Sequence, residues 1–430
     1  MEERAGPVRP ATAIAVISAH ASPLGRLGRG ENGGMNLAIR RLCEELAVRG
    51  VPSDVFVRRD DPDAPSERLI APGSRLVLLE AGPSRPLPKS ELLLHLPRLT
   101  RAVLDHAASE RRRYRLVHGH YWLSGWVASR ASQQWGIPWV QSFHTLARLK
   151  AQVGLPLDAE RAEVEQILVR GADRLIAHSP AEAAALSDLY GADPEAVCVV
   201  PPGVDAELFG PRPLAALRRR HATEGRRVIL YAGRLERLKG LDLLLHAMVR
   251  FRAAGGHDDV VLLCAGGASG DGQSQTDHPG GERGRLEELA RELDLGDAVR
   301  FLGAVDPEEL AGLYALADVA AVPSMTETFG LVALEAQASG TPVVACAVGG
   351  LVGIVDDGVT GTLVEGRDPA VFAAALAAIL DDRGVRARMG DAARERATAW
   401  GWDRSADRLL SLYDCVEEPT VHALAGCACV

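Results

Sequence analysis

The chain has 430 residues, of which 47% are apolar and 24% charged, and its formal net charge is −9. This length suits two domains with separate hydrophobic cores, and the negative charge argues against nucleic acid or an anionic membrane surface as the main partner. No apolar run reaches the ~18 residues that cross a bilayer. The apolar stretch at residues 11–18 is too short for a secretory signal, so we expect a cytoplasmic protein.

Cysteine and lysine usage adds two expectations. The seven cysteines are scattered without the spacing of a metal site, so we expect them to be reduced. The ending CACV resembles a prenylation box, but the Ala/Arg/Leu-rich composition is typical of bacteria, and an irregular tail is the better interpretation. The 48 basic residues include only three lysines, Lys89, Lys150 and Lys239. Each therefore marks a place where a compact charge suits better than a guanidinium fork, unless chance put it there.

Short β-branched runs alternate with amphipathic stretches through the first half of the chain. Strands are expected at residues 13–18, 53–57, 116–118, 139–143, 174–177 and 197–200, and a period of 3.6 predicts a helix at 35–49. Such alternation is typical of a parallel sheet covered by helices on both faces. The run PPG at residues 201–203 breaks the pattern, and the break extends to about residue 213.

The alternation restarts in the second half, with strands expected at 228–232, 260–264, 299–302, 319–322 and 342–345. Residues 268–284 are polar and glycine-rich and are interpreted as a surface loop. The fold class is therefore α/β, with two doubly wound, Rossmann-like domains. The expected boundaries are an N-terminal domain at 1–205, a C-terminal domain at 206–400, a helix at 401–418 that crosses back to the first domain, and a tail at 419–430.

The most informative motif is PSMTETFGLVALEAQASGTPVVACAVGG at residues 323–350. It places Glu327 just before a turn and Glu335 on the apolar helix that follows. Phe329 to Val332 are expected to begin that helix, and their unpaired N–H groups and the helix dipole suit a phosphate. Two carboxylates beside an anion site suit a ligand with both phosphate and hydroxyl groups, such as a nucleotide sugar. A capped core helix with two solvated glutamates would have the same spacing.

Arg234 and Lys239 flank the start of the helix expected after the strand at 228–232. Two cations oppose the usual preference of a helix N-terminus for anions. A diphosphate bound between them would relieve this conflict, and local conflicts of this kind are typical of functional sites. A solvated pair of surface cations is the alternative.

Ligands of open α/β sheets bind beyond the carboxyl ends of the strands. His20 and the run GRGENGGMN at residues 28–36 follow the first strand, where paired glycines allow a ligand to approach the backbone. A plain strand-to-helix turn is the alternative. The spacing is not G-x-G-x-x-G, so a nicotinamide cofactor is not expected.

Histidines follow two later strands of the first domain. His118 and His120 stand at one strand end and are interpreted as pointing opposite ways, with no acid or cysteine nearby, so a metal site is not expected. Tyr121 suits a hydrogen bond to a polyol. His144 and Thr145 follow the next strand, where a core histidine is the alternative.

Together these motifs resemble the retaining family-4 glycosyltransferases of GT-B fold. The matching residues are Gly233-Arg234, Lys239-Gly240, Pro323-Ser324, Glu327-Thr-Phe-Gly330, Glu335, Gly340-Thr341-Pro342-Val343 and Gly349-Gly350, and the similarity covers about residues 12–415. Within that family, the runs HASPL at 20–24, GGMN at 33–36, HYWLSG at 120–125 and HT at 144–145 look like the inositol-phosphate N-acetylglucosaminyltransferases of mycothiol biosynthesis. The resemblance implies two domains that face each other across a cleft.

The resemblance implies a UDP-sugar donor site in the second domain. Arg234 and Lys239 would hold the diphosphate, Glu335 the ribose and Glu327 the transferred sugar. The residues implied in donor binding are Gly34, Arg234, Lys239, Val305, Glu327, Phe329, Gly330, Leu331, Val332 and Glu335. The residues implied in catalysis are Arg234, Lys239, Glu327 and His144. Of these, His144 would touch the sugar near the reacting carbon. No cofactor is required, and a non-catalytic Mg²⁺ near Thr341 is implied by resemblance alone.

The acceptor would bind in the first domain. Its phosphate would be held by Lys89, Tyr121, Thr145 and Arg161, and its ring would face His20, Glu31, Asn32 and Asn36. Two of the three lysines thus fall on phosphate-binding positions. The related enzymes have an aspartate in place of Glu31 and a small residue in place of Asn32, so the acceptor pocket of this chain differs from theirs.

The implied reaction moves N-acetylglucosamine or glucose from UDP to a cyclitol phosphate such as 1D-myo-inositol 3-phosphate, with retention of configuration. The alternatives are a glycosyltransferase of aminocyclitol natural products, a sucrose-phosphate synthase, an epimerase, and a catalytically silent nucleotide-sugar binding protein. Loss of Lys239 or Glu327 would favour the silent protein, and both are present. The sequence does not fix the oligomeric state, and a homodimer is one candidate.

Overall fold

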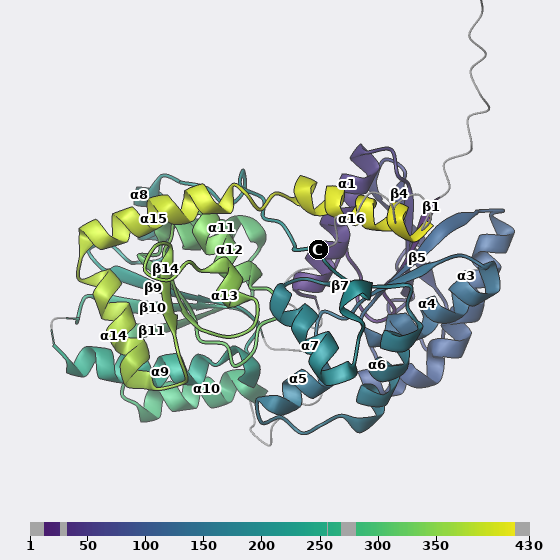
Figure 1. Cartoon of the computed structure of the whole chain (residues 1–430). Helices are drawn as coiled ribbons and strands as arrows, with labels where there is room; N and C mark the ends of the chain where they lie inside the picture. The colour runs from purple at the N-terminus through teal and green to yellow at the C-terminus, as the bar shows by residue number, and fades with distance from the viewer. Residues whose placement is uncertain (1–12, 26–31, 256, 268–280, 418–430) are drawn as a thin grey trace, which may run out of the picture.

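The computed structural model describes residues 13–25, 32–255, 257–267 and 281–417. They form two α/β lobes side by side, each with one sheet between layers of helices (Figure 1). The prediction of two doubly wound α/β units is confirmed. No helix within these described ranges is long and apolar enough to span a membrane.

The N-terminal lobe holds an eight-stranded sheet in the order β3-β4-β2-β1-β5-β6-β7-β8, parallel except between β3 and β4. Its strands are β1 (Ala13–Ile17), β2 (Ser53–Arg58), β3 (Glu67–Ala71), β4 (Ser74–Leu79), β5 (Tyr114–His120), β6 (Trp139–Ser142), β7 (Arg174–Ala177) and β8 (Val197–Val199). Its helices are α1 (Gly34–Val48), α2 (Lys89–Leu92), α3 (Leu96–Ser109), α4 (Trp122–Trp135), α5 (Ala147–Gln152), α6 (Ala159–Gly171) and α7 (Pro180–Tyr190).

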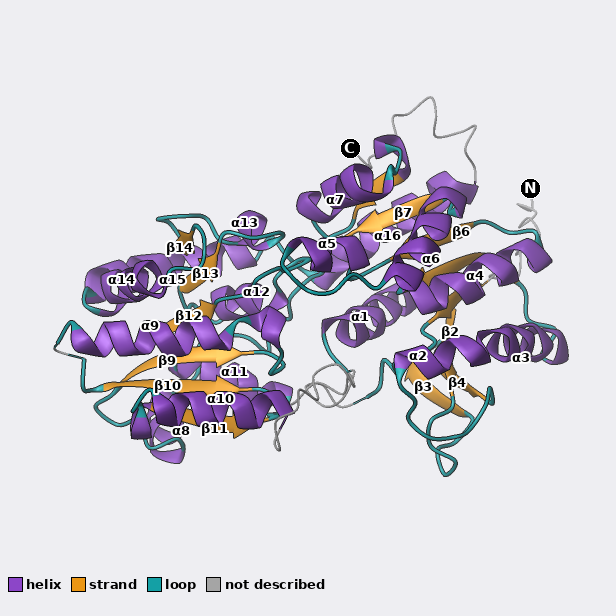
Figure 2. Ribbon diagram, turned by 90° about the horizontal axis from the view of Figure 1, so that it is seen from below, coloured by secondary structure: helices purple, strands orange, loops and turns teal. Residues whose placement is uncertain are grey.

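The C-terminal lobe holds a six-stranded parallel sheet in the order β11-β10-β9-β12-β13-β14, whose strands lie side by side across the view of Figure 2. Its strands are β9 (Arg227–Ala232), β10 (Val260–Ala265), β11 (Val299–Gly303), β12 (Val319–Val322), β13 (Val343–Cys346) and β14 (Gly361–Val364). The helices of this lobe are α8 (Leu214–Arg220), α9 (Leu241–Ala253), α10 (Gly281–Glu292), α11 (Pro307–Leu316), α12 (Leu331–Ala338), α13 (Leu351–Ile354), α14 (Pro369–Leu380) and α15 (Arg383–Ala397). The last helix, α16 (Trp402–Glu417), belongs to the N-terminal lobe.

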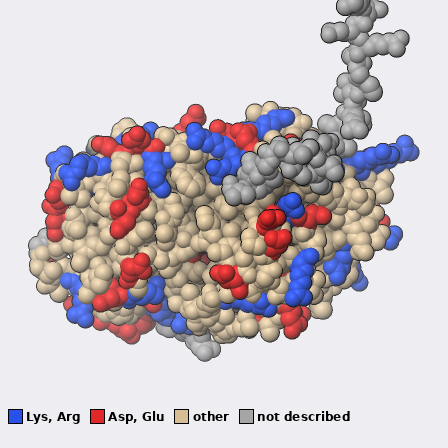
Figure 3. Space-filling view, viewed as in Figure 1, with Lys and Arg blue, Asp and Glu red and all other residues tan. Residues whose placement is uncertain are grey.

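Each sheet has a hydrophobic cluster on both faces, which explains why its central strands are continuous apolar runs. Strands β1 and β10, for example, are buried along their whole length. On the face shown in Figure 3, basic and acidic side chains are interspersed over both lobes. The hydrophobic side chains thus pack on the faces of the two sheets.

All the strands predicted from the sequence exist. Strands β3, β4 and β14 were not predicted. β3 is an edge strand whose residues are mostly exposed, and β14 has only four residues, so neither shows a clear buried pattern. The loop predicted at 268–284 is partly wrong, because α10 begins at Gly281; the rest of it, 268–280, lies outside the described residues. The expected start of a helix at Phe329 is also wrong. Gly330, with φ of 111°, precedes α12, which begins at Leu331.

Two chain segments cross between the lobes side by side. Val204 pairs with Gly401 as an isolated bridge, and the Val204 amide donates to the carbonyl of Trp400 at 2.7 Å. After this crossing, α16 packs on the N-terminal sheet, where Trp402 and Tyr413 belong to a core cluster shared with β1, β2 and α1. The chain thus begins and ends its described fold on the N-terminal lobe.

Candidate active site

A cavity of about 560 Å³ lies between the lobes, a size typical of small-molecule sites. Its walls come from loops that follow strands of both sheets, as the rule for open α/β sheets predicts. The predicted site residues that line it are His20, Asn32, Gly34, Asn36, Lys89, Tyr121, His144, Thr145, Arg234, Lys239, Val305, Glu327, Phe329, Gly330, Leu331, Val332 and Glu335. The donor and acceptor residues proposed from the sequence therefore border a single space.

The N-termini of α1 and α12 meet at this cavity from opposite lobes. A Cβ atom added to Gly34, the first residue of α1, would lie 3.0 Å from Cδ1 of Leu331, the first residue of α12. At Gly33 the same atom would lie 3.8 Å from Nε of Arg234. Both helix starts carry partial positive charge and unpaired amides. Their approach would suit an anion held between the two lobes.

Each predicted cation of the C-terminal wall is paired with a carboxylate. Lys239 Nζ lies 2.7 Å from Glu327 Oε2, and Arg234 Nη2 lies 3.3 Å from Glu236 Oε1. These side chains are partly exposed, so each ion pair contributes little to stability. A diphosphate would compete for both cations, and it would free Glu327 to accept hydrogen bonds from a sugar.

Glycines hold the two loops of this wall close to their neighbours. Gly240 follows Lys239 with φ of 68°, and a Cβ atom there would lie 2.1 Å from the Pro323 carbonyl oxygen. Gly349 has φ of 51°, and its Cβ would lie 2.0 Å from the carbonyl oxygen of Glu327. The motif glycines therefore allow the backbone contacts that position Lys239 and Glu327.

Glu335 is a buried carboxyl group at the rim of the cavity. It lies on α12 with 8% of its surface exposed, and it accepts a hydrogen bond from the Tyr314 hydroxyl at 3.2 Å. Burial raises the pKa of Glu335 to about 8, because the carboxylate loses its hydration. Glu335 is therefore mostly protonated at neutral pH in this structure. Hydroxyl groups that donate hydrogen bonds to it would favour its ionised form.

The N-terminal wall contains a chain of hydrogen-bonded histidines. Nδ1 of His178 lies 3.2 Å from the Val200 carbonyl, and Nε2 of His178 lies 3.0 Å from Nδ1 of His144. Nε2 of His144 lies 2.9 Å from Nδ1 of His120. Burial lowers the pKa of all three rings, so they are neutral. Because the carbonyl can only accept, each Nδ1 carries the proton and each shared Nε2 accepts.

This chain limits what the His144 side chain can do. Both of its ring nitrogens are used by His178 and His120. Its backbone has φ of 62°, a left-handed conformation that is uncommon outside glycine. The predicted contact of His144 with a sugar would therefore be made by its ring carbons or its backbone. A contact by a ring nitrogen would require one of these hydrogen bonds to break.

The expectation that His118 and His120 point opposite ways is wrong. Their ring centroids lie 3.9 Å apart, since residues i and i+2 of a strand project from the same face. His118 instead lies close to the Tyr413 hydroxyl at 2.8 Å and to Ser142 Oγ at 2.9 Å. The two rings are thus part of the buried wall behind His144.

The predicted phosphate-binding residues of the acceptor occupy two layers. Lys89 and Thr145 line the cavity beside Tyr121, and Lys89 Nζ lies 5.5 Å from the centre of the Tyr121 ring. Arg161 does not line the cavity. It is 5% exposed, its Nε lies 2.6 Å from Glu165 Oε1, and its Nη2 donates to the Thr145 hydroxyl at 2.9 Å. In this structure Arg161 supports Thr145 from behind.

The predicted ring-facing residues are held by the turn before α1. Asn36 is fully buried, and its Nδ2 donates to the Ser22 carbonyl at 2.8 Å and to Asn32 Oδ1 at 3.1 Å. Its Oδ1 accepts from the amide of Gly33 at 3.1 Å. Asn36 therefore shapes the glycine turn from below. Glu31, predicted beside Asn32, lies outside the described residues.

Thr341, the residue near the implied Mg²⁺, does not line the cavity. Its side chain is 2% exposed, and its hydroxyl donates to the Tyr314 carbonyl at 2.7 Å. The Mg²⁺ near Thr341 stays a prediction.

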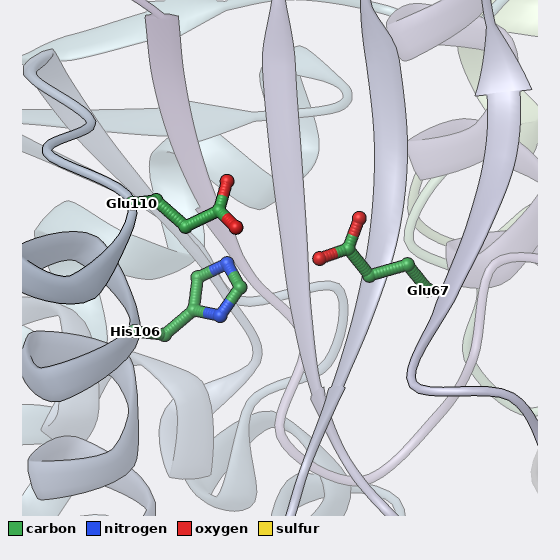
Figure 4. Close-up of side chains that lie close together, drawn as sticks. All are labelled: Glu67, His106 and Glu110. Atoms are coloured by element: carbon green, nitrogen blue, oxygen red, sulfur yellow. The ribbon is translucent and has the colours of Figure 1, made fainter.

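A group with metal-like geometry does exist elsewhere among the described residues, formed by Glu67, His106 and Glu110 at the outer edge of the N-terminal sheet (Figure 4). Arg75 lies 2.9 Å from a carboxylate oxygen of both Glu67 and Glu110. The cluster is therefore an ion-pair network, and Arg75 disfavours a cation there.

Lys150 and His178 also line the cavity, although neither was proposed as a site residue. Lys150 lies on α5, so all three lysines of the chain border one cavity formed by 45 of its 430 residues. Their rarity was the signal that could have found Lys150. His178 directly follows β7, so the strand-end rule would have found it.

Both halves of the chain match known families. Residues 33–203 match the family described as "Glycosyl transferase 4-like domain", and residues 215–396 match "Glycosyl transferases group 1". The chain belongs to the group 1 glycosyltransferases. Among relatives, the D-inositol 3-phosphate glycosyltransferase of Acidothermus cellulolyticus is 42% identical over 93% of this chain and 89% of its own length. That of Nocardiopsis dassonvillei is 41% identical over 99% of both chains.

Solved structures of glycosyltransferases share the fold of this group 1 member. The sucrose-phosphate synthase from Thermosynechococcus elongatus superimposes with a TM-score of 0.86 at 36% identity, over 95% of this chain and 100% of that one. HepE from Anabaena, in complex with UDP and glucose, has a TM-score of 0.75 at 20% identity over 94% and 99% of the two chains, a likeness of fold alone. The GT-B fold and the glycosyltransferase class expected from the sequence are confirmed.

Proposed function

We propose that this glycosyltransferase moves N-acetylglucosamine from a UDP donor to a cyclitol phosphate such as 1D-myo-inositol 3-phosphate, with retention of configuration. The observation that carries the proposal is the arrangement of one cavity. Lys239, Arg234 and the start of α12 line it on the C-terminal side, and Lys89, Tyr121 and Thr145 line it on the N-terminal side. A pair of cations on one wall, and a lysine beside two hydroxyl groups on the other, suit two phosphorylated substrates.

The donor side would act mainly on the leaving group. Departure of UDP places negative charge on its β-phosphate, and preorganised donors near that oxygen commonly contribute about 2.7–4 kcal/mol each. Arg234, Lys239, the amide of Leu331 and the start of α1 at Gly34 would supply these donors. Glu335 would bind the ribose hydroxyls, and Glu327 the hydroxyls of the sugar.

The acceptor side would read a phosphate and a polyol ring. Relatives named D-inositol 3-phosphate glycosyltransferase match nearly the whole chain, which supports a cyclitol phosphate as the acceptor. Lys89 offers a compact charge to the phosphate. Tyr121 and Thr145 offer hydroxyl groups beside it. The proton of the attacking hydroxyl would pass to the departing phosphate, since both ring nitrogens of His144 are engaged.

A sucrose-phosphate synthase activity is the second candidate, because the structural neighbour of that name is 36% identical over 95% of this chain. The product in that name carries a phosphate, as a glycosylated cyclitol phosphate would, so the same cations would serve. The two candidates differ in the ring that His20 and Asn32 face.

The deciding experiment is a panel of UDP- and GDP-sugars against inositol 3-phosphate, inositol, aminocyclitols and fructose 6-phosphate, with products identified by mass spectrometry. We expect one product, from UDP-N-acetylglucosamine and inositol 3-phosphate. Its anomeric configuration, determined by NMR, should match that of the donor. Transfer to inositol but not to its phosphate would contradict the proposal, and transfer to fructose 6-phosphate would favour the second candidate.

A further inference from the structure

Thr328 joins the two lobes beside the cavity that it lines. It lies in the C-terminal lobe between Glu327 and Phe329, yet two hydrogen bonds link it to the N-terminal lobe. Its hydroxyl donates to the carbonyl of His144 at 2.7 Å, and its own carbonyl accepts from the Ser179 hydroxyl at 2.6 Å. Thr328 therefore connects the two lobes at two points.

The two N-terminal partners of Thr328 are themselves connected. Ser179 caps α7, since its oxygen accepts from the amide of Glu182 at 3.2 Å. Its neighbour in sequence, His178, lies 3.0 Å from the ring of His144. The contacts therefore close a ring that runs from His178 to His144, on to Thr328 and back through Ser179. We call these four residues the cross-cleft ring.

The cross-cleft ring lies close to the covalent connection between the lobes. The ring centroid of Phe329, the residue after Thr328, lies 5.6 Å from that of Trp400, and His178 Nδ1 lies 3.2 Å from the Val200 carbonyl. Val204 and Trp402, which belong to the two crossing segments, line the same cavity as His144 and Thr328. The cross-cleft ring therefore adds non-covalent contacts between the lobes to those of the crossing segments. Separation of the lobes at Thr328 would break both of its hydrogen bonds.

The ring also joins the two residues expected to contact the transferred sugar. Glu327 precedes Thr328 directly, and its carbonyl is fixed by the amide of Gly350 at 2.8 Å. His144 has a left-handed backbone, and its carbonyl, which that conformation orients, accepts from Thr328. A shift of Thr328 would therefore move Glu327 and His144 relative to each other.

We propose that Thr328 is a positioning residue for the transfer reaction: its two hydrogen bonds to the N-terminal lobe fix Glu327 and His144 on either side of one sugar. Ser179 and His178 complete the ring and act through Thr328 and His144. This assignment rests on the proposed function for the identity of the sugar, whereas the ring itself depends only on the contacts between the lobes.

The cleanest test compares Thr328→Val with Thr328→Ser. Valine keeps the shape but removes the hydroxyl, which leaves the His144 carbonyl unpaired, whereas serine keeps the donor. We expect Thr328→Val to lower kcat about tenfold with little change in the dissociation constant of UDP alone, measured by calorimetry. Thr328→Ser should stay within about twofold of the wild type. Wild-type kcat in Thr328→Val, or an equal loss in both variants, would overturn the proposal.

Ser179→Ala gives a second route to the ring but also removes a helix cap. Its thermal midpoint is therefore measured beside its kcat. Because both hydrogen bonds belong to one ring, the double variant with Thr328→Val should lose less than the product of the two single losses. Losses in kcat that multiply fully would contradict a shared role.

Hydrogen exchange separates this proposal from the proposed function. In Thr328→Val, peptides covering residues 142–148 and 323–332 should exchange several-fold faster than in the wild type, and Thr328→Ser should not differ. If the wild type transfers no sugar from UDP donors while this exchange pattern appears, the proposed function is wrong and the ring stands. If exchange in both segments is unchanged in Thr328→Val, the ring is wrong whatever the substrate.

Discussion

The two walls of the cavity are built on different physical terms. The C-terminal wall uses charged pairs that are partly exposed, Lys239 with Glu327 and Arg234 with Glu236. The N-terminal wall uses buried, neutral histidines whose tautomers are fixed by the Val200 carbonyl. The charged pairs would exchange partners if a diphosphate bound between them, whereas the histidine chain is already ordered by its own hydrogen bonds. The difference teaches that the C-terminal wall is built to change its contacts and the N-terminal wall to keep them.

The largest loss of kcat is expected from substitution of the two cations of the C-terminal wall. Lys239→Ala and Arg234→Ala should each lower kcat by about 10²- to 10³-fold, because each removes a donor to the charge that develops on the leaving group. The measurement is steady-state release of UDP together with the thermal midpoint. Arg237→Ala is the matched control, since Arg237 belongs to the same turn but is exposed. Normal turnover in the Lys239 variant would contradict the role of this wall.

The close approach of α1 to α12 depends on the absence of a side chain at Gly34. Gly34→Ala would place a Cβ atom 3.0 Å from Leu331, so the approach of α1 to α12 should be hindered and kcat/KM for the donor should fall about tenfold. Gly33→Ala is the control, because its nearest contact is an ordinary 3.8 Å. Leu331→Ala combined with Gly34→Ala should restore part of the loss. If Gly33→Ala is as damaging as Gly34→Ala, the close approach is not the cause.

Substitution of a cation in the N-terminal wall should change KM for the acceptor. Lys89→Ala should raise KM for a phosphorylated acceptor about five- to tenfold, and leave KM for its unphosphorylated form unchanged, because only the phosphate meets the lysine. Arg85→Ala is the control, with a side chain that is 58% exposed. Arg161 is less suitable for this test, since its removal leaves the buried Glu165 without its cation. Equal changes of KM for the phosphorylated and unphosphorylated acceptors would contradict the binding of a phosphate by Lys89.

The smallest expected effect is a pH dependence of nucleotide binding. Burial holds the pKa of Glu335 at about 8, and hydroxyl donors of the ribose favour its ionised form, so UDP binding should release a proton. The affinity for UDP should therefore rise several-fold from pH 6 to pH 8, and Glu335→Gln should flatten that rise. Calorimetry in buffers of different ionisation enthalpy measures the proton directly.

The same shift has the opposite sign for stability. Because the folded state raises the pKa of Glu335 above its unfolded value of about 4.5, the stability that it contributes is present below that value. It is then lost as the pH rises towards 8. Thermal midpoints of the wild type and Glu335→Gln between pH 5 and pH 8 would test this sign.

Much of the fold could be predicted because parallel strands between helices are continuous apolar runs, as in β9 and β12. The donor wall was also accessible, since the order Glu327, turn, helix and Glu335 is local in sequence. The cross-cleft ring was not accessible, because Thr328 and His144 are 184 positions apart. Arg161 was placed one layer too close to the substrate, since spacing cannot separate a residue that lines a wall from one that supports it. The position of His178 after β7 was a usable signal that was overlooked.

Helix α16 has a consequence for how the protein is made. It supplies Trp402 and Tyr413 to the core of the N-terminal lobe, and the Tyr413 hydroxyl lies 2.8 Å from His118, whose ring stacks near His120. A chain emerging from the ribosome therefore lacks part of that core until α16 has been translated, after the whole C-terminal lobe. The lobe that is synthesised first is completed only after the second lobe, and the histidine wall gains its support from Tyr413 at that point.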